Sequence, residues 1–331
     1  MNFSPYYVDP LFLKEENEKK EIRSTANRTA LAFLLMSAVM VLWSYPAFSI
    51  AERFGFAKEL YIWATDVGLL NVFQIVISSV AFIFPFLLLS KLFNLKLNTA
   101  IALNPIKNKK QFVALIFLGM GVFAFANLLT VVAGAILQSM GFVYEANIHH
   151  ENPSGIFGFL LCVLATAVTP AIIEEFAMRG VLYGGLKRFG DGFAILVTSV
   201  VFGLIHGNFE QIPFALVLGL YLGFVRAKTD SIVLAVLLHF LNNFFSVVLS
   251  FVFDKISIDL QNVIYPFYFL ALIGFGFLGI MMLKDENAEF FKFEKVESAL
   301  STSKKITTFL FAPLMIVVWA VVIIEAFFVY A

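Results

Sequence analysis

The chain has very few cysteines and charged residues for its length. Its single cysteine, Cys162, lies inside an apolar run, so it cannot form an intramolecular disulfide and has no second thiol with which to bind a metal. Only 14% of the 331 residues are Asp, Glu, Lys or Arg, against about 25% in an average soluble domain. The missing charge excludes an ordinary soluble protein, because too little polar surface is available to cover it.

The chain also lacks an excess of charge of either sign. Its 23 basic and 23 acidic residues cancel, so no overall field attracts nucleic acid, and no nucleic-acid-binding motif occurs. Internal repeats and low-complexity segments are missing too. Residues 1–28 are long and of mixed charge, unlike the short basic start of a cleavable signal. We therefore expect no nucleic-acid partner and no signal cleavage.

Hydrophobic residues make up 60% of the chain, which includes 41 Phe and has a mean hydropathy of +0.90. A membrane crossing needs roughly 20 apolar residues. Stretches of about this length fall near 29–50, 66–92, 112–139, 155–178, 192–207, 212–228, 231–253, 263–283 and 306–330. The sequence therefore predicts an all-α polytopic membrane protein with about nine crossings. The fifth and sixth are short enough to form a re-entrant hairpin instead.

The regions outside these stretches are charged. Residues 1–28 alternate acids and bases, which is typical of a solvated tail or a short surface helix. We expect a cytoplasmic tail over 1–28 and a transmembrane domain over 29–330. The 284–305 loop mixes charges with Phe and suits a helix at the membrane interface.

The distribution of Lys and Arg predicts the orientation. With the N-terminus inside, 20 of the 23 Lys and Arg residues fall in cytoplasmic segments, and only Arg53, Lys58 and Lys255 fall outside. Cytoplasmic loops are the ones enriched in these residues. The sequence thus predicts a cell-membrane protein with a cytoplasmic N-terminus and an external C-terminus.

Three ionisable residues end the fourth apolar stretch, where charges are costly and usually functional. On a helix, Glu175 and Arg179 share one face because they are four residues apart, whereas Glu174 is rotated by about 100°. We expect Arg179 to hold Glu175 as a structural ion pair. Glu174 is left without a counter-charge, and a carboxylate in apolar surroundings accepts a proton more readily. The alternative is that both acids serve one structural ion network.

The four histidines fall into two groups. His149 and His150 lie in a predicted external loop, where solvent exposure explains them. His206 and His239 lie in the fifth and seventh apolar stretches. Measured from the flanking charges at 1.5 Å per residue, Glu174 and His206 lie roughly 20 Å deep and His239 roughly 13 Å. The three side chains can therefore share one cavity, although a lone membrane histidine can equally be structural.

The residues around His239 suggest a chemistry. Asn243 lies four residues further along, on the same helix face, and Asn242 is also close. His and Asn donors can stabilise an oxyanion, while a Glu and a His can hold a water between them. Amide hydrolysis needs such a set. The competing chemistry is a catalytic zinc held by Glu174, His206 and His239, but no His-Glu-x-x-His pair supports it.

The ordered motifs resemble the signature of a known family. They are Glu174-Glu175-x-x-x-Arg179, Phe202-x-x-x-His206 and His239-x-x-x-Asn243. In this order on separate apolar helices they are similar to the CPBP (Abi) family, which comprises type II CAAX prenyl proteases and bacteriocin-processing or immunity-associated membrane proteins. The resemblance covers about 154–250, which we expect to be the catalytic core.

The resemblance implies an intramembrane endopeptidase of the glutamate type. It implies that Glu174 activates water that His206 helps to position, and that Glu175 and Arg179 maintain the site. It also implies that His239 and Asn243 stabilise the oxyanion. The expected substrate is a membrane-associated peptide or a lipidated, CAAX-like protein.

We expect the cavity to be conical and open to the cytoplasm, and we expect no resident cofactor, although the sequence does not exclude zinc. Two other classes stay open at this point. One is a proton-coupled transporter. The sequence shows neither the internal repeat nor the paired broken helices that are typical of such proteins, which counts against this class. The other is a non-catalytic scaffold or immunity protein.

Overall fold

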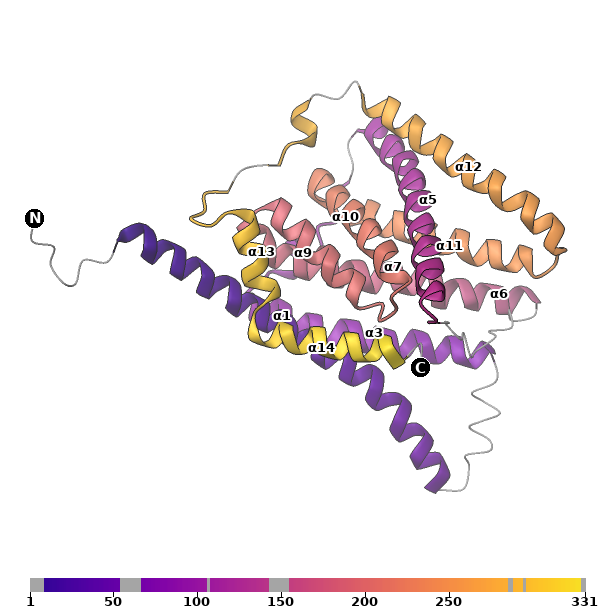
Figure 1. Cartoon of the computed structure of the whole chain (residues 1–331), viewed down its shortest axis with the longest axis horizontal. Helices are drawn as coiled ribbons and strands as arrows, with labels where there is room; N and C mark the ends of the chain where they lie inside the picture. The colour runs from indigo at the N-terminus through magenta and orange to yellow at the C-terminus, as the bar shows by residue number, and fades with distance from the viewer. Residues whose placement is uncertain are drawn as a thin grey trace, which may run out of the picture.

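The computed structural model of the chain describes residues 9–53, 67–105, 108–142, 155–284, 288–293 and 296–328. Nearly all of this is helical (Figure 1). The described residues form no strand, and Leu103 and Ser231 make an isolated bridge between two connections. An all-α membrane fold is thereby confirmed. His149 and His150 lie outside the described residues.

The helices follow one another along the chain in this order. They are α1 (Pro10–Arg53), α3 (Val67–Leu92), α4 (Leu97–Ala100), α5 (Lys109–Ser139), α6 (Gly155–Val163), the π-helical η1 (Leu164–Val168), α7 (Thr169–Glu175), the π-helical η2 (Phe176–Leu182), α8 (Tyr183–Leu186), the 3-10 turn η3 (Lys187–Phe189), α9 (Asp191–Leu204), α10 (Gln211–Thr229), α11 (Val233–Phe253), α12 (Ile258–Leu283), the 3-10 turn η4 (Ala288–Phe291), α13 (Thr302–Leu310) and α14 (Pro313–Phe328).

The predicted nine crossings are not confirmed. In the described part of the chain, seven helices are long and apolar enough to span a bilayer. The bent pair α13 and α14, at 66° to each other, makes an eighth if it is counted as one span. The predicted fifth crossing is α9, whose 14 residues extend only about 21 Å. That is shorter than the hydrocarbon core of about 30 Å.

The charged segment before the first span also differs from the expectation of a solvated tail or a short surface helix. Residues from Pro10 onward belong to α1, which continues without a break into the apolar part. Glu18 accepts hydrogen bonds from the backbone N–H of Ala299 and Leu300, at 2.9 and 3.2 Å. Ile22 is completely buried. This segment therefore packs against the C-terminal region, which local charge alternation could not reveal.

The bundle has two distinct ends. We call one the basic end: it contains the connection from α3 to α5, the 187–191 turn and the 230–232 turn. These connections are joined there, since Asn104 donates to the Asp230 carbonyl at 2.9 Å and Lys305 donates to the Phe189 carbonyl at 2.8 Å. The opposite end contains the N-terminal ends of α3 and α6 and the C-terminal end of α11, which lie together at the right of Figure 1.

Glycines bring the α9–α10 hairpin together. A Cβ at Gly219 would lie 3.0 Å from the Ser199 Cα, and one at Gly223 would lie 3.0 Å from the Ile195 Cγ2. The Gly-x-x-x-Gly spacing in the sixth apolar stretch thus allows close helix approach. This packing fixes the position of the hairpin that carries His206.

Candidate active site

The segment from Gly155 to Phe189 forms one long helical path at the centre of the bundle, between α3 and α11. It is not a regular α-helix, because π-helical turns occupy η1 and η2 on either side of α7. Such turns each insert extra backbone and occur often at functional sites. Glu174 and Glu175 end α7, directly before η2, and this placement was not visible in the sequence.

Glu175 and Arg179 form the predicted ion pair. Arg179 Nη1 donates to Glu175 Oε1 at 2.7 Å, and both side chains are fully buried. Arg179 Nη2 donates to the Gly219 carbonyl at 2.9 Å, and its guanidinium lies 4.7 Å above the centre of the Phe202 ring. The charge of Glu175 is thus matched inside the bundle, and Arg179 ties the α7 region to α9 and α10.

His239 is attached to the same carboxylate. Its Nδ1 lies 2.9 Å from Glu175 Oε1. A carboxylate ion can only accept, so Nδ1 carries the hydrogen in this bond. Its Nε2 then faces Glu174, whose Oε2 is 3.9 Å away. Glu175 therefore orients both Arg179 and His239, a connection between helices that spacing along the chain could not show.

Glu174 is placed differently from Glu175. Its side chain is 16% exposed and lines a cavity, whereas Glu175 is sealed off. Its buried Oε2 has no hydrogen-bond partner among the described residues. Buried polar atoms are normally satisfied, so an unpaired carboxylate oxygen on a cavity wall indicates a position for water or substrate.

His206 lies just beyond the end of α9. Its Nδ1 is 2.8 Å from the Phe202 carbonyl, which can only accept, so Nδ1 carries the hydrogen and Nε2 of the neutral ring is an acceptor. Phe202 also packs edge-on against both histidine rings, with centroids 5.0 Å from His206 and 5.8 Å from His239. The sequence motif contains Phe202, but its role in holding both rings and Arg179 was missed.

Two adjacent amides complete the cluster on α11. Asn242 Nδ2 donates to Asn243 Oδ1 at 3.0 Å, and both residues line the cavity. This bond occupies the acceptor of Asn243 and leaves its Nδ2 hydrogens to the cavity. Asn242, which is 6% exposed, holds its neighbour in place.

The structure brings Glu174, His206, His239 and Asn243 to one cavity of about 510 Å³. Additional polar side chains line it that were not predicted: Gln74, Asn127, Thr130, Thr166, Gln211 and Ser246. Except for Gln211, which follows Glu210 at the start of α10, these polar residues lie within apolar stretches, and that placement is the signal that could have identified them. A half-polar cavity within a membrane bundle is suited to a peptide backbone rather than to a hydrocarbon chain.

Comparison with known proteins finds a family match over the central part of the chain. The model described as "Type II CAAX prenyl endopeptidase Rce1-like" matches residues 156–245, which include every motif residue of the cavity. Over this segment, the match supports the resemblance to the CPBP family. The apolar helices show an integral membrane protein, and the family that the segment matches is one of CAAX-type proteases.

A curated relative supports this resemblance. The chain is 25% identical over 114 residues to the "Putative membrane peptidase YdiL" of Bacillus subtilis (strain 168). The match covers 33% of this chain and 47% of the relative, so it spans about half of the relative's length. No solved structure matches the chain.

The sequence left a metal site in the cavity open. Within the described residues, no three His, Cys, Asp or Glu side chains gather closely enough to hold a metal ion. The zinc set considered from the sequence, Glu174 with His206 and His239, is not found as such a group among the described residues. We derive no step through a metal.

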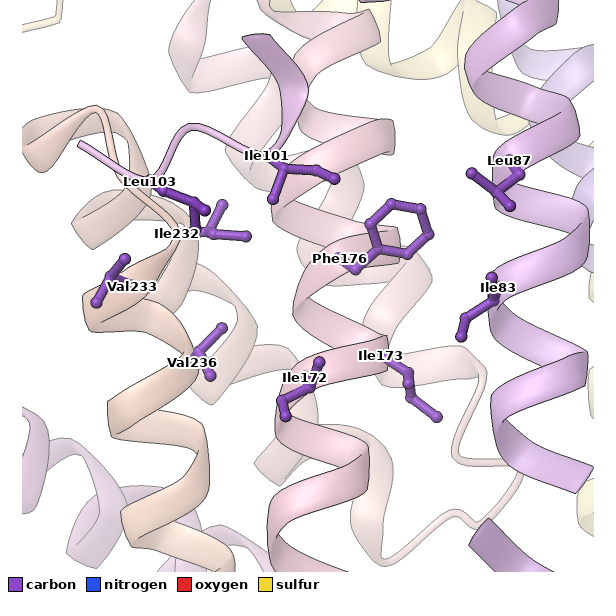
Figure 2. Close-up of a pocket in the computed structure, with 10 residues that line it drawn as sticks. All are labelled: Ile83, Leu87, Ile101, Leu103, Ile172, Ile173, Phe176, Ile232, Val233 and Val236. Atoms are coloured by element: carbon purple, nitrogen blue, oxygen red, sulfur yellow. The ribbon is translucent and has the colours of Figure 1, made fainter. Parts of the chain in front are cut away.

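A second hollow lies on another face of α7. It is an apolar groove of about 490 Å³, shown in Figure 2 between α3 and the start of α11. Its lining residues are Ile83, Leu87, Ile101, Leu103, Ile172, Ile173, Phe176, Ile232, Val233 and Val236. Glu174 is not among them. The groove can hold hydrocarbon, but it has no group that could perform chemistry.

Proposed function

We propose that this protein is an intramembrane endopeptidase in which Glu174 activates a water molecule. The observation that supports this most strongly is the unpaired Glu174 carboxylate oxygen, on a polar cavity wall beside His239 Nε2. The nearby Nε2 of His206 is an acceptor. A water between Glu174 and His206 can donate one hydrogen to each.

The proposed reaction balances with these groups alone. The water oxygen attacks the scissile carbonyl carbon while its proton passes to Glu174. The carbonyl oxygen becomes an oxyanion that accepts from Asn243 Nδ2 and from a proton on His239 Nε2. When the C–N bond breaks, Glu174 delivers its proton to the leaving nitrogen. The products are a free carboxyl and a free amine.

The charges around the site are consistent with this scheme. With His239 protonated, the two cations His239 and Arg179 balance the two carboxylates Glu174 and Glu175. The hydrogen bond of His239 to Glu175 then joins opposite charges, and its Nε2 faces the Glu174 carboxylate at 3.9 Å, in a buried site where charges need such pairing. Glu175 is proposed to act through its partners and not on substrate.

The proposed substrate is a peptide segment that enters the membrane. The cavity lining is rich in amide and hydroxyl groups, which can pair with an extended peptide backbone. A prenyl or acyl chain on the substrate would need an apolar site, and the apolar groove lies on another face of α7. We therefore propose that cleavage itself does not require lipidation, which unlipidated and lipidated forms of one peptide can test.

The two amides should differ in their effect on the reaction. Asn243→Ala is expected to lower kcat by roughly 10²–10³-fold, the cost of removing one oxyanion donor. Asn242→Ala should cost less, because it removes only the bond that holds Asn243 in place. Kinetics with a fluorogenic peptide and purified variants measure both. An Asn243→Ala variant with unchanged kcat would contradict the proposed oxyanion role.

The proposed hydrolysis is metal-free, which a chelator tests directly. Purified protein should cleave the fluorogenic peptide at the same rate before and after treatment with 1,10-phenanthroline or EDTA. Loss of activity on chelation, with recovery on addition of Zn²⁺, would instead establish a zinc peptidase and overturn the water-activation scheme.

A further inference from the structure

The polar cavity opens away from the basic end of the bundle. Its exposed lining residues are Gln74, near the start of α3, Gln211, at the start of α10, and Ser246, in the last part of α11. These three helix ends lie on the side of the bundle that is remote from the basic end. The mouth of the cavity therefore lies in the half of the bundle nearer the opposite end.

The other side of the cavity is closed. Fully buried side chains lie between the basic end and the pair Glu174 and His239. They include Arg179, Phe202, Leu222 and Leu238. Arg179 also bridges this layer by its bonds to Glu175 and the Gly219 carbonyl. A substrate approaching from the basic end would have to break this packed ionic layer. The expected opening to the cytoplasm is accordingly not confirmed.

The distribution of charge relates these two ends to the cell. Lys and Arg residues concentrate at the basic end: Lys91, Lys109, Lys187, Lys228 and Lys284 all lie at helix ends there. At the opposite end, by contrast, the basic residue Lys255 follows α11. Such an asymmetry places the basic end in the cytoplasm.

We propose that the active-site cavity is entered from outside the cytoplasm. If the proposed function holds, its substrates are peptide segments that are exported, or exposed in the outer half of the bilayer, and not C-termini presented in the cytoplasm. The apolar groove of Figure 2 is separate from the cavity and lies towards the basic end, beside the 101–103 connection.

Cysteine accessibility tests this proposal without any cleavage assay. In a Cys162→Ser background, single cysteines are placed at two mouth positions, Gln74→Cys and Ser246→Cys. Ser257→Cys, in the exposed cap of α12, marks the opposite end, and Ser303→Cys, on the exposed side of α13, marks the basic end. Spheroplasts are treated with a small membrane-impermeant methanethiosulfonate, and remaining thiols are then labelled with biotin after lysis.

We expect the reagent to block Ser257→Cys and at least one mouth cysteine in intact spheroplasts, with loss of the later biotin signal. Ser303→Cys should be blocked only after permeabilisation. The proposal would be overturned if the reagent blocked the mouth cysteines only after permeabilisation, or at no stage. It would also be overturned if intact spheroplasts allowed blocking of Ser303→Cys but not of Ser257→Cys. Failure of peptide cleavage would overturn the proposed function and leave the labelling pattern unaffected.

Discussion

Replacing Glu174 with Gln is expected to lower peptide cleavage by about 10²–10⁴-fold, the contribution of a positioned general base. The amide has the shape of the carboxylate but cannot take the proton from water. Because Glu174 lines a cavity and its Oε2 has no partner, the substitution should hardly change the thermal midpoint. Cleavage rates and thermal unfolding of the purified protein measure the two effects.

A matched control is available in the same bilayer. Glu325 is a partly buried carboxylate on α14 and does not line the cavity. Glu325→Gln should therefore leave cleavage unchanged. Full activity of Glu174→Gln would eliminate the proposed mechanism. Retained biological function with lost cleavage would indicate a scaffolding role, the alternative that the sequence left open.

Replacing Arg179 with Met is expected to cost about 3–5 kcal/mol of folding free energy, since it leaves the Glu175 charge buried without its main partner. The double variant Glu175→Gln/Arg179→Met should be more stable than Arg179→Met, because the amide carries no charge and can still accept from His239. Thermal unfolding in detergent gives the order of the variants. Purely additive losses would contradict a direct ion pair.

The control for this second prediction is an exposed pair. Arg188 and Glu21 lie 2.9 Å apart at the basic end, with about half of each side chain exposed. Such surface pairs contribute roughly 0–1 kcal/mol. Arg188→Met should therefore change the thermal midpoint far less than Arg179→Met does.

Much of the site could be predicted because it depends on local helix geometry. Glu175 and Arg179 share a face by their spacing, and the structure joins them. Depth estimated from flanking charges also placed Glu174, His206 and His239 close enough to share a cavity, and all three line one cavity. These inferences need only the rise and rotation per residue of a helix.

The remainder depends on contacts between distant segments. Glu18 accepts hydrogen bonds from the backbone N–H groups of Ala299 and Leu300. The charged start of α1 therefore packs against the C-terminal region, although its alternating charges had indicated exposure to solvent. The π-helical turns η1 and η2 have no periodic signal in an apolar run. The opening of the cavity is set by how tightly Arg179, Phe202 and their neighbours pack, which no hydropathy profile contains.

The most direct test of water activation by Glu174 is a single-turnover reaction in H₂¹⁸O. The purified protein in lipid nanodiscs is held in excess over peptide, and the new C-terminus is analysed by mass spectrometry. General-base catalysis predicts that ¹⁸O from the solvent enters the new carboxyl in the first turnover. A product that carries only ¹⁶O would show direct attack by a protein carboxylate and would contradict the account, as would the absence of any new C-terminus.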